Sequence, residues 1–232
     1  MADGHLYVAM QPIVDLARRE IFGYEALVRS RSPDFPDPPS ILRAAVADGF
    51  MGELGRALRL MAVQACPDSR LFLNLHPSEF DEGWLVRPDD AIFSHDRSIY
   101  LEITESVPLS HFRWCHSVLR EVRSKGVYLA VDDLGAGYSN FKYIADLAPE
   151  VVKLDRDLIT NLDSDPRLRT LVTSLVSLCR DLGAKVVAEG IETTSELHAI
   201  EECGAQYGQG YLLARPAFPP PKVSWAAFNR RT

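Results

Sequence analysis

Short apolar runs and segments with helical spacing alternate along this chain of 232 residues. After two opening apolar runs separated only by the tetrapeptide ARRE, a run followed by a helical segment recurs through the rest of the chain. Parallel strands need a crossover connection, which is usually a helix, so this alternation is typical of a parallel sheet covered by helices. The short ARRE connection instead predicts that the first two strands form an antiparallel hairpin.

The number of strands favours a closed barrel. The eight expected strands cover residues 6–16, 20–30, 71–75, 99–103, 127–133, 151–154, 184–188 and 206–213. The expected helices cover residues 40–47 with Ser40 as cap, 52–65, 110–125 capped by Ser110, 141–147, 166–183 and 194–203. The pattern predicts an α/β fold, a (β/α)₈ TIM-like barrel with one antiparallel strand near the N-terminus. An open dinucleotide-binding sheet is disfavoured, since no G-x-G-x-x-G opens an early helix.

We expect one domain over residues 1–232, with a core at about 6–216 and a Pro-rich tail at 217–232. The apolar stripe of the helix over 166–183 is interpreted as core, with Leu171 and Leu182 among its members. The Pro-rich segment 32–40 is expected to be a surface loop. The chain could still be one module of a longer protein.

Composition narrows the function and the compartment. A net charge of −7 argues against nucleic-acid binding, which needs a basic face, although bound divalent cations would let an acidic protein take a phosphorylated small molecule. The four cysteines are scattered, without a C-x-x-C pair, which favours reduced thiols in the cytoplasm. The first residues have neither a basic start nor a long apolar stretch, so no signal peptide or membrane contact is expected.

Acidic residues repeatedly end the apolar runs. In a parallel barrel the strand ends meet at one face, where functional residues gather, so these side chains are expected to share one cavity. The candidates are Glu25, Asn74, Glu102, Glu105, Asp132, Asp133, Lys153, Glu189, Glu192 and Gln209. Seven of them are carboxylates, which cannot all stay ionised together without cations. Oxygen ligands without Cys or clustered His select Mg²⁺ or Mn²⁺, and two such ions would bind a phosphate and activate a water.

Several of these residues also have ordinary structural interpretations. Adjacent Asp132 and Asp133 are compatible with a solvated turn. The amide of Asn74 would bond either to backbone or, through its carbonyl, to a metal. Lys153, expected to orient water or stabilise a phosphate, is equally compatible with a salt-bridged strand lysine. Arg29 suits a phosphate oxygen or an exposed surface position.

These motifs together resemble the EAL domain family of cyclic di-GMP phosphodiesterases. Eight blocks occur in family order over residues 10–216: QPI at Gln11, E-A-L-V-R at Glu25 to Arg29, LNL at Asn74, E-x-T-E at Glu102 to Glu105, DD-x-G-x-G-Y-S from Asp132, K-x-D at Lys153 and Asp155, AEG-x-E at Glu189 to Glu192, and QG-Y from Gln209.

The resemblance implies hydrolysis of cyclic di-GMP to linear pGpG with two Mg²⁺ or Mn²⁺ ions, and a homodimer. Ca²⁺ is larger and geometrically lax, so it is expected to inhibit by displacing the octahedral ion. The resemblance implies as metal ligands Glu25, Asn74, Glu102, Asp132, Asp133 and Glu189, with Lys153, Glu189, Glu25 and Asp133 as the catalytic group. The implied substrate-binding residues are Gln11, Leu27, Arg29, Asp155, Glu192 and Gln209. Glu105 would anchor the loop that follows Asp132, near a dimer interface, and sensory domains are frequent fusion partners.

Three positions depart from the family pattern. Leu134 and Ala136 stand where the family usually has Phe and Thr, and His76 stands where a small hydroxyl residue is commoner. These departures bear on loop ordering and dimer-linked control more than on metal binding. Two alternatives stay open beside the phosphodiesterase. One is a silent cyclic di-GMP receptor, although no expected ligand is missing. The other is an enolising barrel enzyme using Lys and Mg²⁺, for which the E-x-L-x-R and QG-Y blocks have no purpose.

Overall fold

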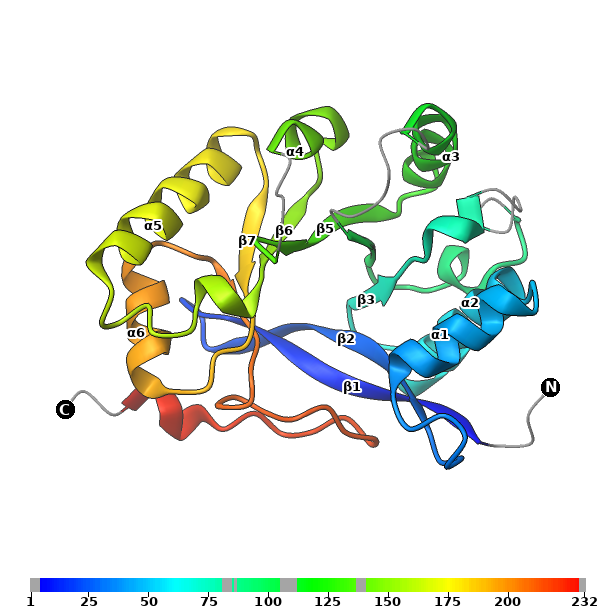
Figure 1. Cartoon of the computed structure of the whole chain (residues 1–232), viewed down its shortest axis with the longest axis horizontal. Coiled ribbons are helices and arrows are strands. Elements are labelled where there is room, and N and C mark those ends of the chain that lie inside the picture. The colour runs from blue at the N-terminus through cyan, green and yellow to red at the C-terminus, as the bar shows by residue number, and fades with distance from the viewer. Residues whose placement is uncertain (1–4, 81–84, 86, 105–111, 137–140, 230–232) are drawn as a thin grey trace.

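Eight strands close into a barrel in chain order, from β1 to β8 (Figure 1). This computed structural model describes the chain except residues 1–4, 81–84, 86, 105–111, 137–140 and 230–232. The strands are β1 Leu6–Asp15, β2 Glu20–Ser30, β3 Leu71–Asn74, β4 Ile99–Thr104, β5 Tyr128–Leu134, β6 Val151–Leu154, β7 Lys185–Ala188 and β8 Tyr207–Gly208. β1 pairs antiparallel with both β2 and β8, whereas every other neighbouring pair is parallel. The predicted barrel with one antiparallel strand is therefore confirmed.

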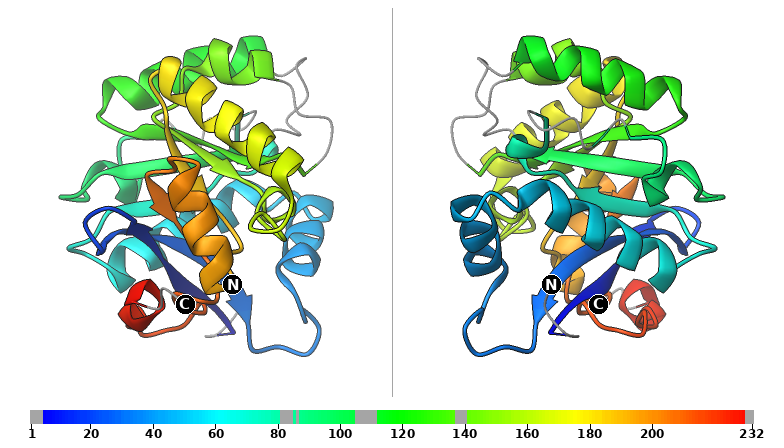
Figure 2. Two further views of the ribbon diagram at one scale, coloured as in Figure 1. Left: turned by 90° about the vertical axis from the view of Figure 1, so that its left-hand side faces the viewer. Right: turned by 90° about the vertical axis from the view of Figure 1, so that its right-hand side faces the viewer.

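Helices surround the barrel on its outside (Figure 2). The α-helices are α1 Pro38–Ala47, α2 Met51–Ala65, α3 Phe112–Ser124, α4 Phe141–Leu147, α5 Pro166–Asp181 and α6 Thr194–Glu202. The short 3₁₀ helices are η1 Pro77–Phe80, η3 Ala91–Phe93, η5 Arg156–Leu158 and η6 Trp225–Asn229. Within the described part of the chain, none of the helices combines the length and the apolar character that crossing a bilayer requires.

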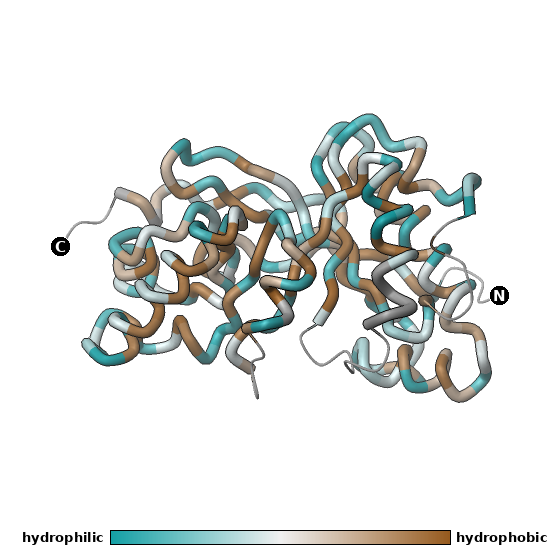
Figure 3. Tube along the Cα trace, turned by 90° about the horizontal axis from the view of Figure 1, so that it is seen from above, coloured by the Kyte–Doolittle hydropathy of each residue, from teal (hydrophilic) through white to brown (hydrophobic). Residues whose placement is uncertain are grey.

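The C-terminal segment lies beside β1 (Figure 1). Met10 of β1 exchanges backbone hydrogen bonds with Ala217. Further along this segment, Val223 and Phe228 are buried in the main apolar core between strands and helices. In Figure 3 apolar positions are frequent along the central strands and hydrophilic ones along the outer turns. The barrel interior holds a second, smaller core, which includes Phe72 and Tyr100 stacked face to face.

The expectation of a long last strand over 206–213 was wrong. β8 contains only Tyr207 and Gly208, because the chain then turns to bond with the loop after β7. The Ile191 N–H donates to the Gln209 carbonyl, and the Leu212 N–H donates to the Ile191 carbonyl. Gly210 lies so close to the Ile191 backbone that a side chain there would overlap it. An apolar run alone cannot distinguish this close turn from a continuing strand.

Two helix predictions also need correction. The cap of the first helix lies three residues before the expected one, because Asp37 accepts from the Ser40 backbone N–H and Ser40 is the return partner of that capping box. Leu171 of α5 and Leu182, which caps its C-terminus, are expected in the core from the apolar stripe, but they are 47% and 40% exposed. The Ser110 cap expected for α3 lies outside the described residues.

A cluster of buried charges fixes the region between α2 and β4. Arg59 of α2 pairs with Glu79 of η1 and with Asp90, and each of the three is at most 2% exposed. Asp90 also caps η3 through the Ile92 N–H. Because buried charges are costly unless they are paired, this cluster joins three segments in one arrangement.

Substituting Gly55 of α2 should break this cluster. A Cβ at residue 55 would overlap the Glu79 carboxylate. Gly55→Ala should therefore lower the free energy of unfolding by about 2–4 kcal/mol, although alanine is the better helix former. Denaturant unfolding measures the effect. The control is Arg56→Ala. Arg56 also lies on α2, but its ion pair with Asp89 is exposed, so the substitution should barely change stability. Equal stabilities of wild type and Gly55→Ala would contradict the assignment.

Candidate active site

The barrel mouth is built on an apolar layer of inward-facing side chains. That layer is Ile13, Phe72, Tyr100, Ala130, Val151, Val187 and Tyr207. Side chains alternate along a strand, so the next inward position lies two residues nearer the carboxyl end of each parallel strand. These positions are Asn74, Glu102, Asp132, Lys153, Glu189 and Gln209. In the reversed β1 the mouth lies toward the amino end, which places Gln11 two residues before Ile13 and opposite Glu25.

Lys153 is the centre of this mouth. Its Nζ lies 2.7 Å from Glu102 Oε1, 2.7 Å from Glu189 Oε1, 2.9 Å from Asp132 Oδ1 and 3.5 Å from Glu25 Oε2. The lysine is only 1% exposed. Burial by itself would lower the pKa of Lys153, but the four carboxylates outweigh it and hold the pKa well above its ordinary value. The salt-bridged interpretation of this lysine is therefore correct in this structure, and it is compatible with a catalytic role.

Amide side chains hold the Glu25 carboxylate in place. Gln209 Nε2 donates to Glu25 Oε2 at 2.6 Å and to Gln11 Oε1 at 3.1 Å. Asn74 Nδ2 donates to Glu25 Oε1 at 3.2 Å, so this amide bonds to a site residue rather than to backbone. Gln11 is held in turn by donating to the Ala214 carbonyl. This chain of bonds fixes one wall of the mouth.

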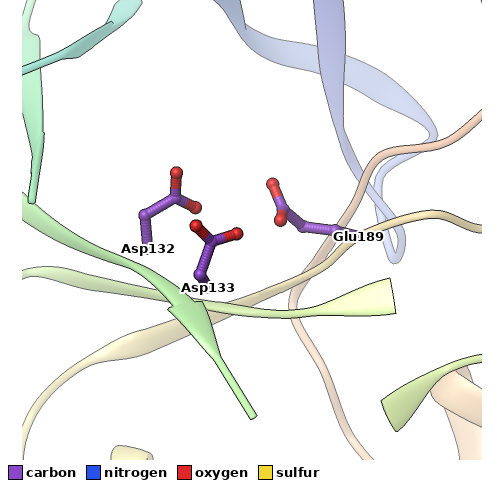
Figure 4. A group of neighbouring side chains, drawn as sticks. All are labelled: Asp132, Asp133 and Glu189. Atoms are coloured by element: carbon purple, nitrogen blue, oxygen red, sulfur yellow. The ribbon is translucent and has the colours of Figure 1, made fainter. Parts of the chain in front are cut away.

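Asp133 joins Asp132 in the mouth because the strand changes conformation there. Consecutive residues of a regular strand point to opposite faces. Asp133, however, has φ of 60°, and the pairing of β5 with β6 shifts register between Val131 and Leu134. Figure 4 shows the carboxylates of Asp132, Asp133 and Glu189 turned toward one another, and ligand oxygens of the three lie within 4.8 Å of each other.

The mouth contains more negative charge than its lysine neutralises. Burial raises the pKa of Glu102 well above its ordinary value, that of Glu189 to about 8 and that of Asp133 to about 6, and neighbouring carboxylates add to each shift. Glu102 Oε2 is buried and has no hydrogen-bond partner among the described residues. Oxygen donors, excess charge and an unpartnered buried acceptor together fit hard divalent cations.

The predicted substrate residues lie in different places. Leu27 and Glu25 line both the mouth, a cavity of about 270 Å³, and a neighbouring cavity of about 470 Å³. Arg29 lines only the larger cavity, and its Nη1 donates to the Val28 carbonyl. Glu192 lies at the rim, paired with Arg156 at 3.2 Å. Asp155 follows β6 but caps η5 and lines neither of these two cavities.

One predicted site residue lies outside the described structure, and several residues in or near the mouth were not predicted from the sequence. Glu105 lies outside the described residues, so its anchoring role stays a prediction. Arg156 and Tyr211 line the mouth, although no motif argument selected them individually. The burial of Arg59 was also not predicted, because an arginine in a helix is usually exposed unless it is paired.

Among the described residues, Lys153 is the one cationic side chain that pairs with these four carboxylates. Lys153→Met should therefore destabilise the metal-free protein by about 3–5 kcal/mol, the usual cost of leaving buried charges unpaired. Mn²⁺ should stabilise this variant more than wild type, because the ions replace the missing charge. Thermal unfolding with EDTA or Mn²⁺ measures both effects. The control Lys185→Met removes an exposed lysine from the opposite end of the barrel. Unchanged stability of metal-free Lys153→Met would contradict this electrostatic assignment.

Comparisons with known proteins agree with the site. The sequence profile of the EAL domain matches residues 1–216. The cyclic di-GMP phosphodiesterase PA2567 of Pseudomonas aeruginosa is 33% identical over 94% of this chain, which spans only 40% of that relative's length. Among solved structures, the PaMucR phosphodiesterase in complex with c-di-GMP has a TM-score of 0.81 at 28% identity, covering 92% of both chains. The manganese and cyclic di-GMP complex of Klebsiella pneumoniae BlrP1 has a TM-score of 0.80 at 28% identity, covering 96% of this chain and 58% of the other. The chain belongs to the EAL domain family.

Proposed function

We propose that this chain hydrolyses one phosphodiester bond of cyclic di-GMP, giving linear pGpG, with Mg²⁺ or Mn²⁺. The observation that carries the proposal is the convergence of Glu25, Glu102, Asp132 and Glu189 on Lys153 in one buried mouth. The names of related EAL proteins support cyclic di-GMP as the substrate.

The residues that would hold two ions are those with oxygen donors in the mouth. In this proposal the ions would be held by Glu25, Asn74, Glu102, Asp132 and Glu189 together with Asp133. The bound ions supply Lewis-acid stabilisation of the phosphate and lower the pKa of a water molecule. The unpartnered Glu102 oxygen and the raised pKa values of Glu189 and Asp133 support a site that is completed by cations.

The chain's own groups would orient the reaction. Lys153 presents an ammonium between Asp132 and Glu189, where it can orient the attacking water and stabilise charge developing on the phosphate. Glu25 and Asp133 complete the catalytic group around it. The substrate would contact Gln11, Leu27, Arg29, Asp155, Glu192 and Gln209. The guanidinium of Arg29 is suited to a phosphate oxygen.

We also propose that residues 1–232 act as one EAL-type domain in the cytoplasm, as a homodimer, and as part of a longer protein with sensory domains. Cys66, Cys179 and Cys203 are buried free thiols, which supports a reducing compartment. Coverage of less than half of PA2567 supports the longer protein.

Hydrolysis is tested by incubating the protein with cyclic di-GMP and Mn²⁺ and separating the products by chromatography. Wild type should produce pGpG. Lys153→Ala should bind cyclic di-GMP with similar affinity but turn it over about 100-fold more slowly, because it lacks the group that orients the attacking water. Lys185→Ala is the matched control and should keep wild-type turnover. If wild type is stabilised by cyclic di-GMP without product, the chain is a receptor and the hydrolase assignment is wrong.

Replacing Mn²⁺ with Ca²⁺ separates the effect of coordination geometry on activity from the effect of charge, because both ions are divalent. Ca²⁺ is larger and tolerates irregular coordination, so it should bind the carboxylates without supporting the reaction. Adding Ca²⁺ to the Mn²⁺ assay should lower the rate in proportion to its occupancy, and excess Mn²⁺ should restore it. Full activity with Ca²⁺ as the only divalent cation would contradict this expectation.

A further inference from the structure

The larger cavity beside the mouth has mainly apolar walls. It lies between the ends of β2 and β3 and the helices α1 and α2. Glu25, Leu27 and Asp133 line this cavity and the mouth together, so the two spaces adjoin. The apolar lining includes Val8, Pro38, Leu42, Met51, Leu58 and Leu73. A flat aromatic ring is suited to such apolar walls.

His76 lines this cavity, and its hydrogen bonds fix its tautomer. The Ser78 backbone N–H donates to His76 Nδ1 at 3.2 Å, and Ser78 Oγ lies 2.8 Å from the same nitrogen. A backbone N–H can only donate, so Nδ1 is the acceptor and the ring proton is on Nε2. The described residues provide no hydrogen-bond partner for that N–H.

The buried charge cluster holds the backbone of His76. Glu79 Oε1 accepts from the His76 N–H at 3.1 Å, while its other oxygen is paired with Arg59. Arg59 is fixed in turn by Asp90. His76 also lies two residues after Asn74 of the mouth. A donor positioned by a rigid network can bind a ligand with little loss of conformational entropy.

We propose that His76 is a specificity-determining residue, whose Nε2–H donates to the acceptor edge of one guanine base lying in this cavity. The inference rests on the proposed function, since a phosphodiester in the mouth would place an attached base in the adjoining space. Guanine presents two acceptors, O6 and N7, at that edge, whereas adenine has an amino donor in place of O6. Because N7 accepts in both bases, a fixed N–H donor favours guanine over adenine when it is directed at the O6 position.

The test compares two variants with two ligands in the Mn²⁺ assay. His76→Phe keeps a ring of similar size but has no donor, and His76→Gln keeps a side-chain N–H. His76→Phe should raise KM for cyclic di-GMP about tenfold with little change in kcat, the size expected for one lost hydrogen bond. The inhibition constant of cyclic di-AMP, added as a competitor, should stay nearly unchanged. His76→Gln should recover part of the lost preference.

The control is His95→Ala, which removes a half-buried histidine that bonds to the Ser69 carbonyl away from both cavities. It should leave both constants unchanged. If His76→Phe is unstable in thermal unfolding, His76→Leu replaces it. An unchanged KM in a folded variant, or equal weakening of both ligands, would overturn the role of His76. Failure of wild type to bind or cleave cyclic di-GMP would instead overturn the proposed function.

Discussion

Four carboxylates surround the ammonium of Lys153 at the carboxyl end of the barrel, and the rest of the site depends on this arrangement. Like charges buried together repel one another and lose hydration, which opposes folding. The lysine offsets one charge, while burial above all, and the neighbouring carboxylates in addition, raise the pKa values of Glu102 and Glu189. The fold therefore maintains a mouth that favours cations, a common property of sites that bind phosphate through divalent ions.

The barrel makes this arrangement possible through alternation and one reversal. Each strand from β3 to β8 contributes an apolar inward residue, and a polar side chain follows two positions later. β1 runs the other way, so it contributes Gln11 from before its apolar residue, and Gln11 joins the bonds that hold Glu25. A single residue with positive φ, Asp133, breaks the alternation and brings a second aspartate into the mouth. Regular structure thus supplies most of the site, and one local irregularity completes it.

The sequence predicted the barrel, the hairpin and the central residues because those features depend on local patterns. Strand ends in a parallel barrel meet at one face, so Glu102, Lys153 and Glu189 could be grouped without coordinates. Features set by tertiary contacts were missed. The turn after β8 depends on the backbone of Ile191, which is remote from β8 in the sequence pattern. Leu171 belongs to the apolar stripe of α5, but the stripe alone did not reveal that this side chain is 47% exposed.

The charge cluster around Arg59 and the orientation of His76 also depend on tertiary contacts and were missed for that reason. A buried arginine is recognisable only when its partners are known, and both Glu79 and Asp90 come from loop-rich sequence. His76 was noted as a departure from the family, but its donor direction follows from Ser78 and could not be read from residue type.

Anomalous diffraction from a crystal of this chain grown with Mn²⁺ tests the central claim most directly. The account predicts two manganese peaks in the barrel mouth, coordinated by oxygens of Asp132, Asp133 and Glu189 together with Glu25, Asn74 and Glu102. Lys153 should remain beside them. A mouth in which these carboxylates point apart, or one without manganese at saturating concentration, would contradict it.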